Sequence, residues 1–420
     1  MCTPADTDTT DRHEVPAYTR DTGQQDARQD TPAGPGAAPE DTPRIHLIAS
    51  PATAKELAER LAGLNSEDFV AFDTEFIRST TYTPRTALLQ LAIGPDCYLI
   101  DPYETPSYYQ VLTSFINTRA TVLVFSGKED YAVLAQEAML AGLPPRQPRF
   151  LDVQLMYAFM RKGSSPGLIR VVEEQLGITM DKSETLSDWS QRPLSDAQLQ
   201  YAAYDVFYLE RLYRTMLPKL GARRCAWLKE ESISLARAGI EDPTALDCYM
   251  GFSHTGVLSQ LELTRLYFLV EQRLAYARSH DEAVNRVITT SAMPHLAAEC
   301  PYIFPGLISC GVSWGCARAH SREILKWLSK ARKLKADPRL PHTYEFYTKG
   351  AHREKAQLLK EQLEKIALEA GIEDQLLTSR QLLADWVKRD EEGTAAGPGT
   401  DKKAGASAAI GGNGLADGNG

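Results

Sequence analysis

The segment Phe69–Phe76 (FVAFDTEF) carries two carboxylates in an apolar setting. If it is a β-strand, Asp73 and Glu75 share one face, and both faces are otherwise mostly apolar, as in a strand covered on two sides. Two carboxylates about 6–7 Å apart on such a face repel each other. A divalent cation such as Mg²⁺ or Mn²⁺, which prefers hard oxygen ligands, would remove that repulsion. An edge strand with solvated carboxylates explains the same pattern.

Two further carboxylates occupy helix positions that could complete a metal site. Tyr201 and Asp205 are four residues apart on one predicted helix, so their side chains share a face. Asp130 lies in the first turn of another predicted helix. Each also has an ordinary structural explanation. Tyr201 and Asp205 are equally explained as a Tyr–Asp pair at a packed surface. Asp130 is equally explained as a carboxylate that the helix dipole favours in the first turn, and the adjacent Glu129 competes for any role assigned to Asp130.

These residues need a fold that brings a strand and two helices together, and residues 45–218 have the pattern of an α/β domain. Three closely spaced strands, two of them joined by a turn at residues 94–96, predict a meander. Strands and helices then alternate, which predicts a mixed sheet flanked by helices. A capping box, Ser195 with Gln198, marks the start of the last helix. The predicted strands are Phe69–Phe76, Ala87–Ile93, Cys97–Ile100, Thr121–Phe125 and Arg149–Val153, and the predicted helices are Glu129–Ala141, Leu168–Leu176 and one that follows Ser195.

Residues 219–388 have the pattern of an all-helical region. Within Leu258–Arg278, apolar residues recur at steps of three and four, which is helical spacing. Further helices are predicted over 318–336 and 353–388. The sequence therefore predicts a helical region after the α/β domain.

Charge is distributed unevenly along the chain. The net charge of −9, from 46 basic and 55 acidic residues, at first argues against a nucleic-acid partner. However, residues 45–205 carry 20 acidic and 13 basic residues, net −7, whereas residues 206–388 carry 21 acidic and 26 basic residues, net +5. An acidic half joined to a basic half is a weak indication of nucleic-acid binding. The terminal segments 1–44 and 393–420, rich in small and polar residues, are predicted to be disordered.

Several classes of protein are disfavoured by the sequence. No window approaches about 18 consecutive apolar residues, the signature of a membrane span. The N-terminus lacks the basic and apolar segments of a secretory signal. The seven cysteines are odd in number and show no zinc-binding spacing. We therefore expect a cytoplasmic protein with reduced thiols and no membrane partner.

Taken together, the motifs resemble a known family. FDTEF at 72–76, GKEDY at 127–131 and YAAYD at 201–205 are similar to the three motifs of the DEDD exonuclease superfamily, in its tyrosine-bearing branch. ALLQLA and the segment 181–209 are similar to the ribonuclease D family. The resemblance covers roughly residues 45–215.

The resemblance implies a ribonuclease H-like α/β fold and a two-metal nuclease centre. The carboxylates that it assigns to two divalent cations, Mg²⁺ or Mn²⁺, are Asp73, Glu75, Asp130 and Asp205. It implies that Tyr201 orients the attacking water. Phe125 stands where the family often has a histidine; because that histidine is not a metal ligand, Asp130 stays in the predicted site.

The helical half is similar to the HRDC module, a nucleic-acid-binding domain. The similarity predicts one HRDC domain at 255–337 and part of a second HRDC-like region at 345–389. A basic run in the first gives the candidate RNA-binding residues Arg318, Arg322, Lys326, Lys330, Arg332, Lys333 and Lys335. A solvated helix face is the ordinary alternative for this run. Trp314 and Trp327 lie in and beside it, and are either base-stacking or core residues.

The expected activity is that of a 3′-5′ exoribonuclease of the ribonuclease D type, which releases nucleoside 5′-monophosphates from RNA 3′ ends. Structured RNA, such as tRNA precursors, is the expected partner, and no obligate protein partner is evident. A DNA 3′-5′ exonuclease is the first alternative, because the cations act on the phosphate and not on the 2′-hydroxyl. A non-catalytic RNA-binding adaptor is the second, although an adaptor has no need of a costly carboxylate cluster.

Overall fold

The computed structural model describes residues 42–105, 108–143, 148–160, 166–180 and 188–391. The segments predicted to be disordered, 1–44 and 393–420, lie outside these ranges apart from residues 42–44. Residues 181–187, the start of the ribonuclease D-like segment, also lie outside them.

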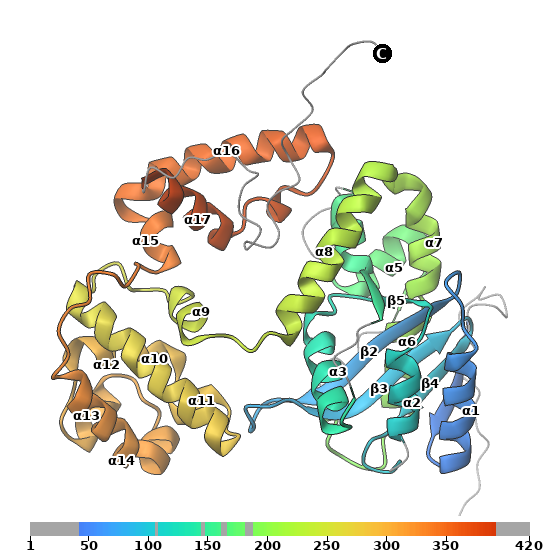
Figure 1. The fold of residues 1–420 in the computed structure, drawn as a ribbon, viewed down its shortest axis with the longest axis horizontal. Coiled ribbons are helices and arrows are strands. Elements are labelled where there is room, and N and C mark those ends of the chain that lie inside the picture. The colour runs from blue at the N-terminus through green and yellow to red at the C-terminus, as the bar shows by residue number, and fades with distance from the viewer. Residues whose placement is uncertain (1–41, 106–107, 144–147, 161–165, 181–187, 392–420) are drawn as a thin grey trace, which may run out of the picture. The chain divides into compact units, whose positions relative to one another are not determined.

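A six-stranded mixed sheet organises the N-terminal half of the described chain (Figure 1). Its order is β1-β4-β3-β2-β5-β6. The consecutive strands β2, β3 and β4 pair antiparallel and form the predicted meander, whereas β1 with β4, β2 with β5 and β5 with β6 pair parallel. The strands are β1 Arg44–Ile48, β2 Phe69–Ile77, β3 Arg85–Ile93, β4 Asp96–Ile100, β5 Thr121–Val124 and β6 Arg149–Asp152.

Helices cover both faces of this sheet. Those on one face are α1 Pro51–Ala62, α2 Tyr108–Ile116 and α3 Lys128–Leu140. Those on the other are α4 Val153–Phe159, α5 Leu168–Leu176, α6 Asp196–Phe207 and α7 Leu209–Leu220. The long helix α8, Ala222–Ile240, packs against α3 and β6. The prediction of a mixed sheet flanked by helices is therefore confirmed.

The position of β2 decides between the two explanations of its carboxylates. β2 lies between β3 and β5, so it is not an edge strand. Val70 and Phe72 pack into the core shared with α1 and α2, while Ala71 packs into the core shared with α6 and α7. Asp73 and Glu75 follow on the same face as Ala71, beneath α6. The strand therefore holds two carboxylates on an interior face of the sheet.

Local sequence signals explain how α6 begins and how closely it approaches the sheet. The Ser195 hydroxyl accepts the backbone N–H of Gln198 at 3.2 Å, and the Gln198 side chain accepts the N–H of Ser195 at 3.0 Å, which confirms the predicted capping box. Ala202 and Ala203 are fully buried. Because these side chains are small, the helix packs directly on β3 and β4, with Tyr201 and Asp205 beside the contact.

The C-terminal half is helical, as predicted. Its helices are α9 Ala245–Met250, α10 Gln260–His280, α11 Val284–Val287, α12 Met293–Glu299, α13 Phe304–Ser309, α14 Trp314–Ala331, α15 Tyr344–Thr348, α16 Arg353–Ala370 and α17 Arg380–Glu391. The apolar repeat of α10 buries Leu263, Leu266 and Val270 in a core with α12 and α14. None of the described helices combines the length and the apolarity that crossing a membrane requires. The two HRDC assignments, 255–337 and 345–389, stay predictions.

Candidate active site

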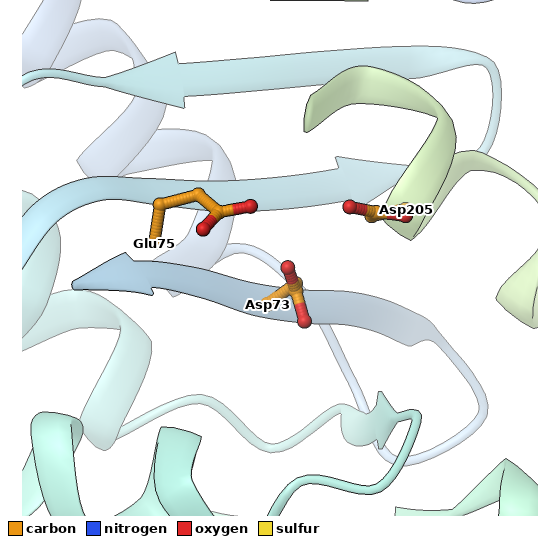
Figure 2. A group of neighbouring side chains, drawn as sticks. All are labelled: Asp73, Glu75 and Asp205. Carbon is orange, nitrogen blue, oxygen red and sulfur yellow. The ribbon is translucent and has the colours of Figure 1, made fainter. Parts of the chain in front are cut away.

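Three of the four predicted carboxylate ligands converge between β2 and α6. One oxygen from each of Asp73, Glu75 and Asp205 lies within 4.8 Å of the others. Figure 2 shows the three carboxylates turned into one space, two from the strand and one from the helix. Strand alternation places the first two on one face, and the packing of α6 on the sheet brings the third to them.

Asp130 lies beside this cluster but is held separately. It is in the first turn of α3, is 6% exposed, and accepts a hydrogen bond from the Thr74 hydroxyl at 2.5 Å. Its charge still acts on the carboxylates of β2 and α6, so the four groups share one electrostatic environment. Glu129 is not a competitor for this position, because it forms an ion pair with Arg78 at 2.5 Å where both side chains are about half exposed.

The turn that carries Asp130 depends on a residue that sequence reasoning missed. Asp152, 2% exposed, accepts the backbone N–H groups of Ser126 at 3.3 Å and Gly127 at 3.0 Å. The same carboxylate caps the start of α4 by accepting the N–H of Leu155 at 3.1 Å. A side chain at Gly127 would come within 2.6 Å of Val124. The signal available in the sequence was an aspartate directly before a helix, the usual mark of an N-cap.

Tyr201 lies on the same face of α6 as Asp205, as its spacing predicted, and its hydroxyl hydrogen-bonds to the Asp205 carboxylate. Its ring lies 6.2 Å from that of Trp189. A pocket of about 420 Å³ opens beside these residues, and its lining includes Tyr201, Tyr204 and Asp205. This volume falls within the range of small-molecule sites, and of the four carboxylates Asp205 lines the pocket.

Burial and mutual repulsion make the cluster a poor place for four free negative charges. Burial first, and then the charges of the other three carboxylates, raise the pKa of Asp73 well above its usual range. Burial and the charges of Asp205 and Asp130 raise the pKa of Glu75 to about 8. Burial raises the pKa of Asp205 to about 7 against the lowering effect of Tyr201, and that of Asp130 to about 6 against the Thr74 hydrogen bond. Clustered hard oxygen donors with this charge excess fit divalent cations such as Mg²⁺ or Mn²⁺.

The predicted RNA-binding residues fall into two groups. Arg318, Arg322, Lys326 and Lys330 are exposed at four-residue intervals along α14, and Lys333 and Lys335 are exposed just after it. They make a basic stripe, which we define as these six side chains. Their role in binding RNA stays a prediction.

Arg332 differs from the basic stripe because it has partners within the protein. Its guanidinium donates to the backbone carbonyls of Cys300 at 2.9 Å and Pro301 at 3.0 Å, and lies over the ring of Tyr302. Of the two tryptophans, Trp327 is a core residue at 5% exposure, whereas Trp314 is 66% exposed. Of these two, only Trp314 is exposed enough to stack on a base.

Comparisons with known proteins agree with this geometry. A family model for a 3′-5′ exonuclease domain matches residues 45–221. Ribonuclease D of *Cronobacter turicensis* is 31% identical over 273 residues, which cover 64% of this chain and 72% of that protein. Ribonuclease D of *Haemophilus influenzae* is 29% identical over 323 residues, 76% of this chain and 79% of that protein.

A solved structure, that of *Escherichia coli* RNase D, matches with a TM-score of 0.68 and 27% identity, covering 83% of this chain and 91% of that one. The family resemblance read from the motifs is thus confirmed by relatives that align along most of their length. The chain belongs to the ribonuclease D family of 3′-5′ exonucleases.

Proposed function

We propose that this exoribonuclease hydrolyses the terminal phosphodiester bonds of RNA from the 3′ end with the help of two divalent cations, Mg²⁺ or Mn²⁺. The observation that carries the proposal is the convergence of Asp73, Glu75 and Asp205 within 4.8 Å at the edge of a pocket. Asp130, which shares their electrostatic environment, is the fourth proposed ligand. The products are nucleoside 5′-monophosphates.

The chemistry of the donors supports divalent metal dependence. All four side chains are carboxylates, which suit hard cations, and burial is the largest cause of the raised pKa of each, so the ionised cluster is favoured by positive counter-charge. When bound, two such cations stabilise the attacking and the leaving oxygen of an in-line displacement at phosphorus. The family also depends on divalent metal, so the residues and the family agree.

We assign Tyr201 to positioning the nucleophile. Its hydroxyl hydrogen-bonds to Asp205, and both residues line the pocket, so it is close to the proposed ligands. A phenol generally keeps its proton at neutral pH, and therefore it donates a hydrogen bond better than it removes a proton. Tyr201 thus orients the attacking water or the scissile phosphate, while the carboxylates set the charge of the site.

We propose structured RNA 3′ ends, such as those of tRNA precursors, as the substrates. The similar *Escherichia coli* protein is described as an exoribonuclease involved in structured RNA processing. The basic stripe on α14 offers a row of exposed cations suited to a phosphate backbone. RNA that is gripped through its backbone can present its 3′ end to a separate acidic centre.

The test uses 5′-labelled RNA and DNA of one sequence, incubated with purified protein with Mg²⁺ or with EDTA. We expect a ladder of RNA shortened from the 3′ end only with Mg²⁺, and no ladder with Asp73→Asn, which removes a ligand charge with little change in volume. DNA shortened while RNA stays intact would support the DNA exonuclease alternative. The absence of shortening in both substrates would support the adaptor alternative.

A further inference from the structure

Gln90, in the middle of β3, is a buried polar side chain without a hydrogen-bond partner. It is 0% exposed, and among the described residues neither its side-chain oxygen nor its nitrogen finds a partner. Buried polar groups are normally paired, and leaving one unpaired destabilises the folded protein. The residues around Gln90 explain why two unpaired polar atoms lie in the core of the sheet.

The strand register places Gln90 directly opposite Asp73. β2 and β3 are antiparallel, and opposite residues of such a pair point to the same face, with Cβ atoms about 4.5–5.5 Å apart. On its other side Gln90 is paired with Leu99 of β4. Its neighbours on this face of β3 are Leu88 and Ala92, so Asp73 is the hydrogen-bonding side chain closest to it in register.

Asp73 has acceptor capacity to spare. A carboxylate has about four lone-pair sites, and Asp73 accepts a backbone hydrogen bond from Thr74. A bound cation would take up part of the remaining capacity, and the other lone pairs of Asp73 would stay available to a hydrogen-bond donor. The amide nitrogen of Gln90 is a donor that reaches the opposite side chain by a change of rotamer. An unpaired donor and an under-used acceptor therefore face the same space.

We propose that Gln90 is a positioning residue for the metal centre: its amide donates a hydrogen bond to the Asp73 carboxylate when cations are bound and so fixes the orientation of that ligand. The proposal rests on the proposed function. It explains why an amide lies in an apolar layer. The amide is unpaired and destabilising in the metal-free protein, and it gains a hydrogen bond when cations are bound. Ligating carboxylates held by such a partner bind metal better, and loss of the partner weakens binding about 10–100-fold.

The test compares metal affinity and stability in full-length Gln90→Met, which keeps the volume but removes the amide. Mn²⁺ binding is followed by titration calorimetry, and the melting temperature is measured with EDTA and with saturating Mn²⁺. We expect Mn²⁺ to bind at least tenfold more weakly, while the melting temperature in EDTA is equal to or above that of the unmodified protein. A purely structural role would lower the melting temperature in EDTA and leave the Mn²⁺ affinity unchanged, and that result would overturn the proposal.

Two further variants keep the outcome interpretable. Gln90→Leu also removes the amide while it keeps an apolar side chain of similar size, so we expect it to bind Mn²⁺ at least tenfold more weakly even if Gln90→Met does not fold; unchanged affinity in it would overturn the proposal. Leu91→Met, the adjacent residue on the opposite face, serves as the control and should leave Mn²⁺ affinity unchanged. If the unmodified protein binds no Mn²⁺, the proposed function fails; if it binds and Gln90→Met binds equally well, only the role of Gln90 fails.

Discussion

Cation binding to this site should release protons, because burial raises the pKa values of its carboxylates. At pH 7, Glu75, with a pKa raised to about 8, holds a proton in about nine molecules out of ten, and Asp205, at about 7, in half of them. Burial and the charges of the neighbouring carboxylates also raise the pKa of Asp73 well above its usual range. Because metal ligands must be deprotonated, loading the centre at pH 7 should release at least one proton.

The assay is titration calorimetry of Mn²⁺ into metal-free protein in buffers of different ionisation enthalpy, in which the slope gives the number of protons released. The release should fall by about one proton in Glu75→Gln, which cannot be protonated in this way. With at least one proton displaced, the dissociation constant should rise at least about tenfold for each pH unit below 7. Saturable binding at pH 7 with less than half a proton released would refute the reasoning, because the carboxylates would then be charged without their cations.

Three other changes should have distinct effects. Tyr201→Phe should lower kcat about 10–100-fold at saturating Mn²⁺, as checked by nuclease kinetics, because the cations are then bound and the positioning hydroxyl is lost. Thr74→Val should raise the pKa of Asp130 above about 6, so activity should fall more at pH 6.5 than at pH 8.5; a pH–rate profile parallel to that of the unmodified enzyme would contradict this. Lys326→Glu on α14 should weaken RNA binding for every sequence and flatten its salt dependence by about one to two units, whereas the same reversal at the exposed Lys55 of α1 should leave the salt slope unchanged.

The sheet could be predicted because its strands carry their own signals. β2, β3 and β4 are apolar runs separated by short turns, and the structure places their ends within two residues of the predicted ones. β1 was missed because it is a short edge strand whose first four residues are exposed, so RIHLI shows no apolar run of core type. Its place is fixed by tertiary contacts, including the ion pair of Arg44 with Asp96.

Local periodicity predicted those parts of the candidate site that lie within a single strand or a single helix. Alternation put Asp73 and Glu75 on one face, and helical spacing put Tyr201 with Asp205. Neither rule could show that Thr74 holds Asp130, because that hydrogen bond joins residues 56 positions apart.

Gln90 and Asp152 escaped prediction for a similar reason. The significance of Gln90 depends on the register between β2 and β3, and that of Asp152 on a turn that precedes it by 25 residues. A single sequence specifies such pairings only through the complete fold. The resemblance to the family motifs placed Asp130 in the predicted site, whereas no motif predicts a role for Gln90 or Asp152.

The central claim is that the carboxylates of β2 and α6 hold the cations that make hydrolysis possible. The most direct test is the initial rate of mononucleotide release from RNA as Mg²⁺ is titrated, for the unmodified enzyme and for Asp205→Asn with its fold checked by circular dichroism. The account predicts a saturable dependence on Mg²⁺ for the former, and a rate at least about 1,000-fold lower for the latter at every Mg²⁺ concentration. Equal rates in folded Asp205→Asn, or full activity of the unmodified enzyme in EDTA, would contradict it.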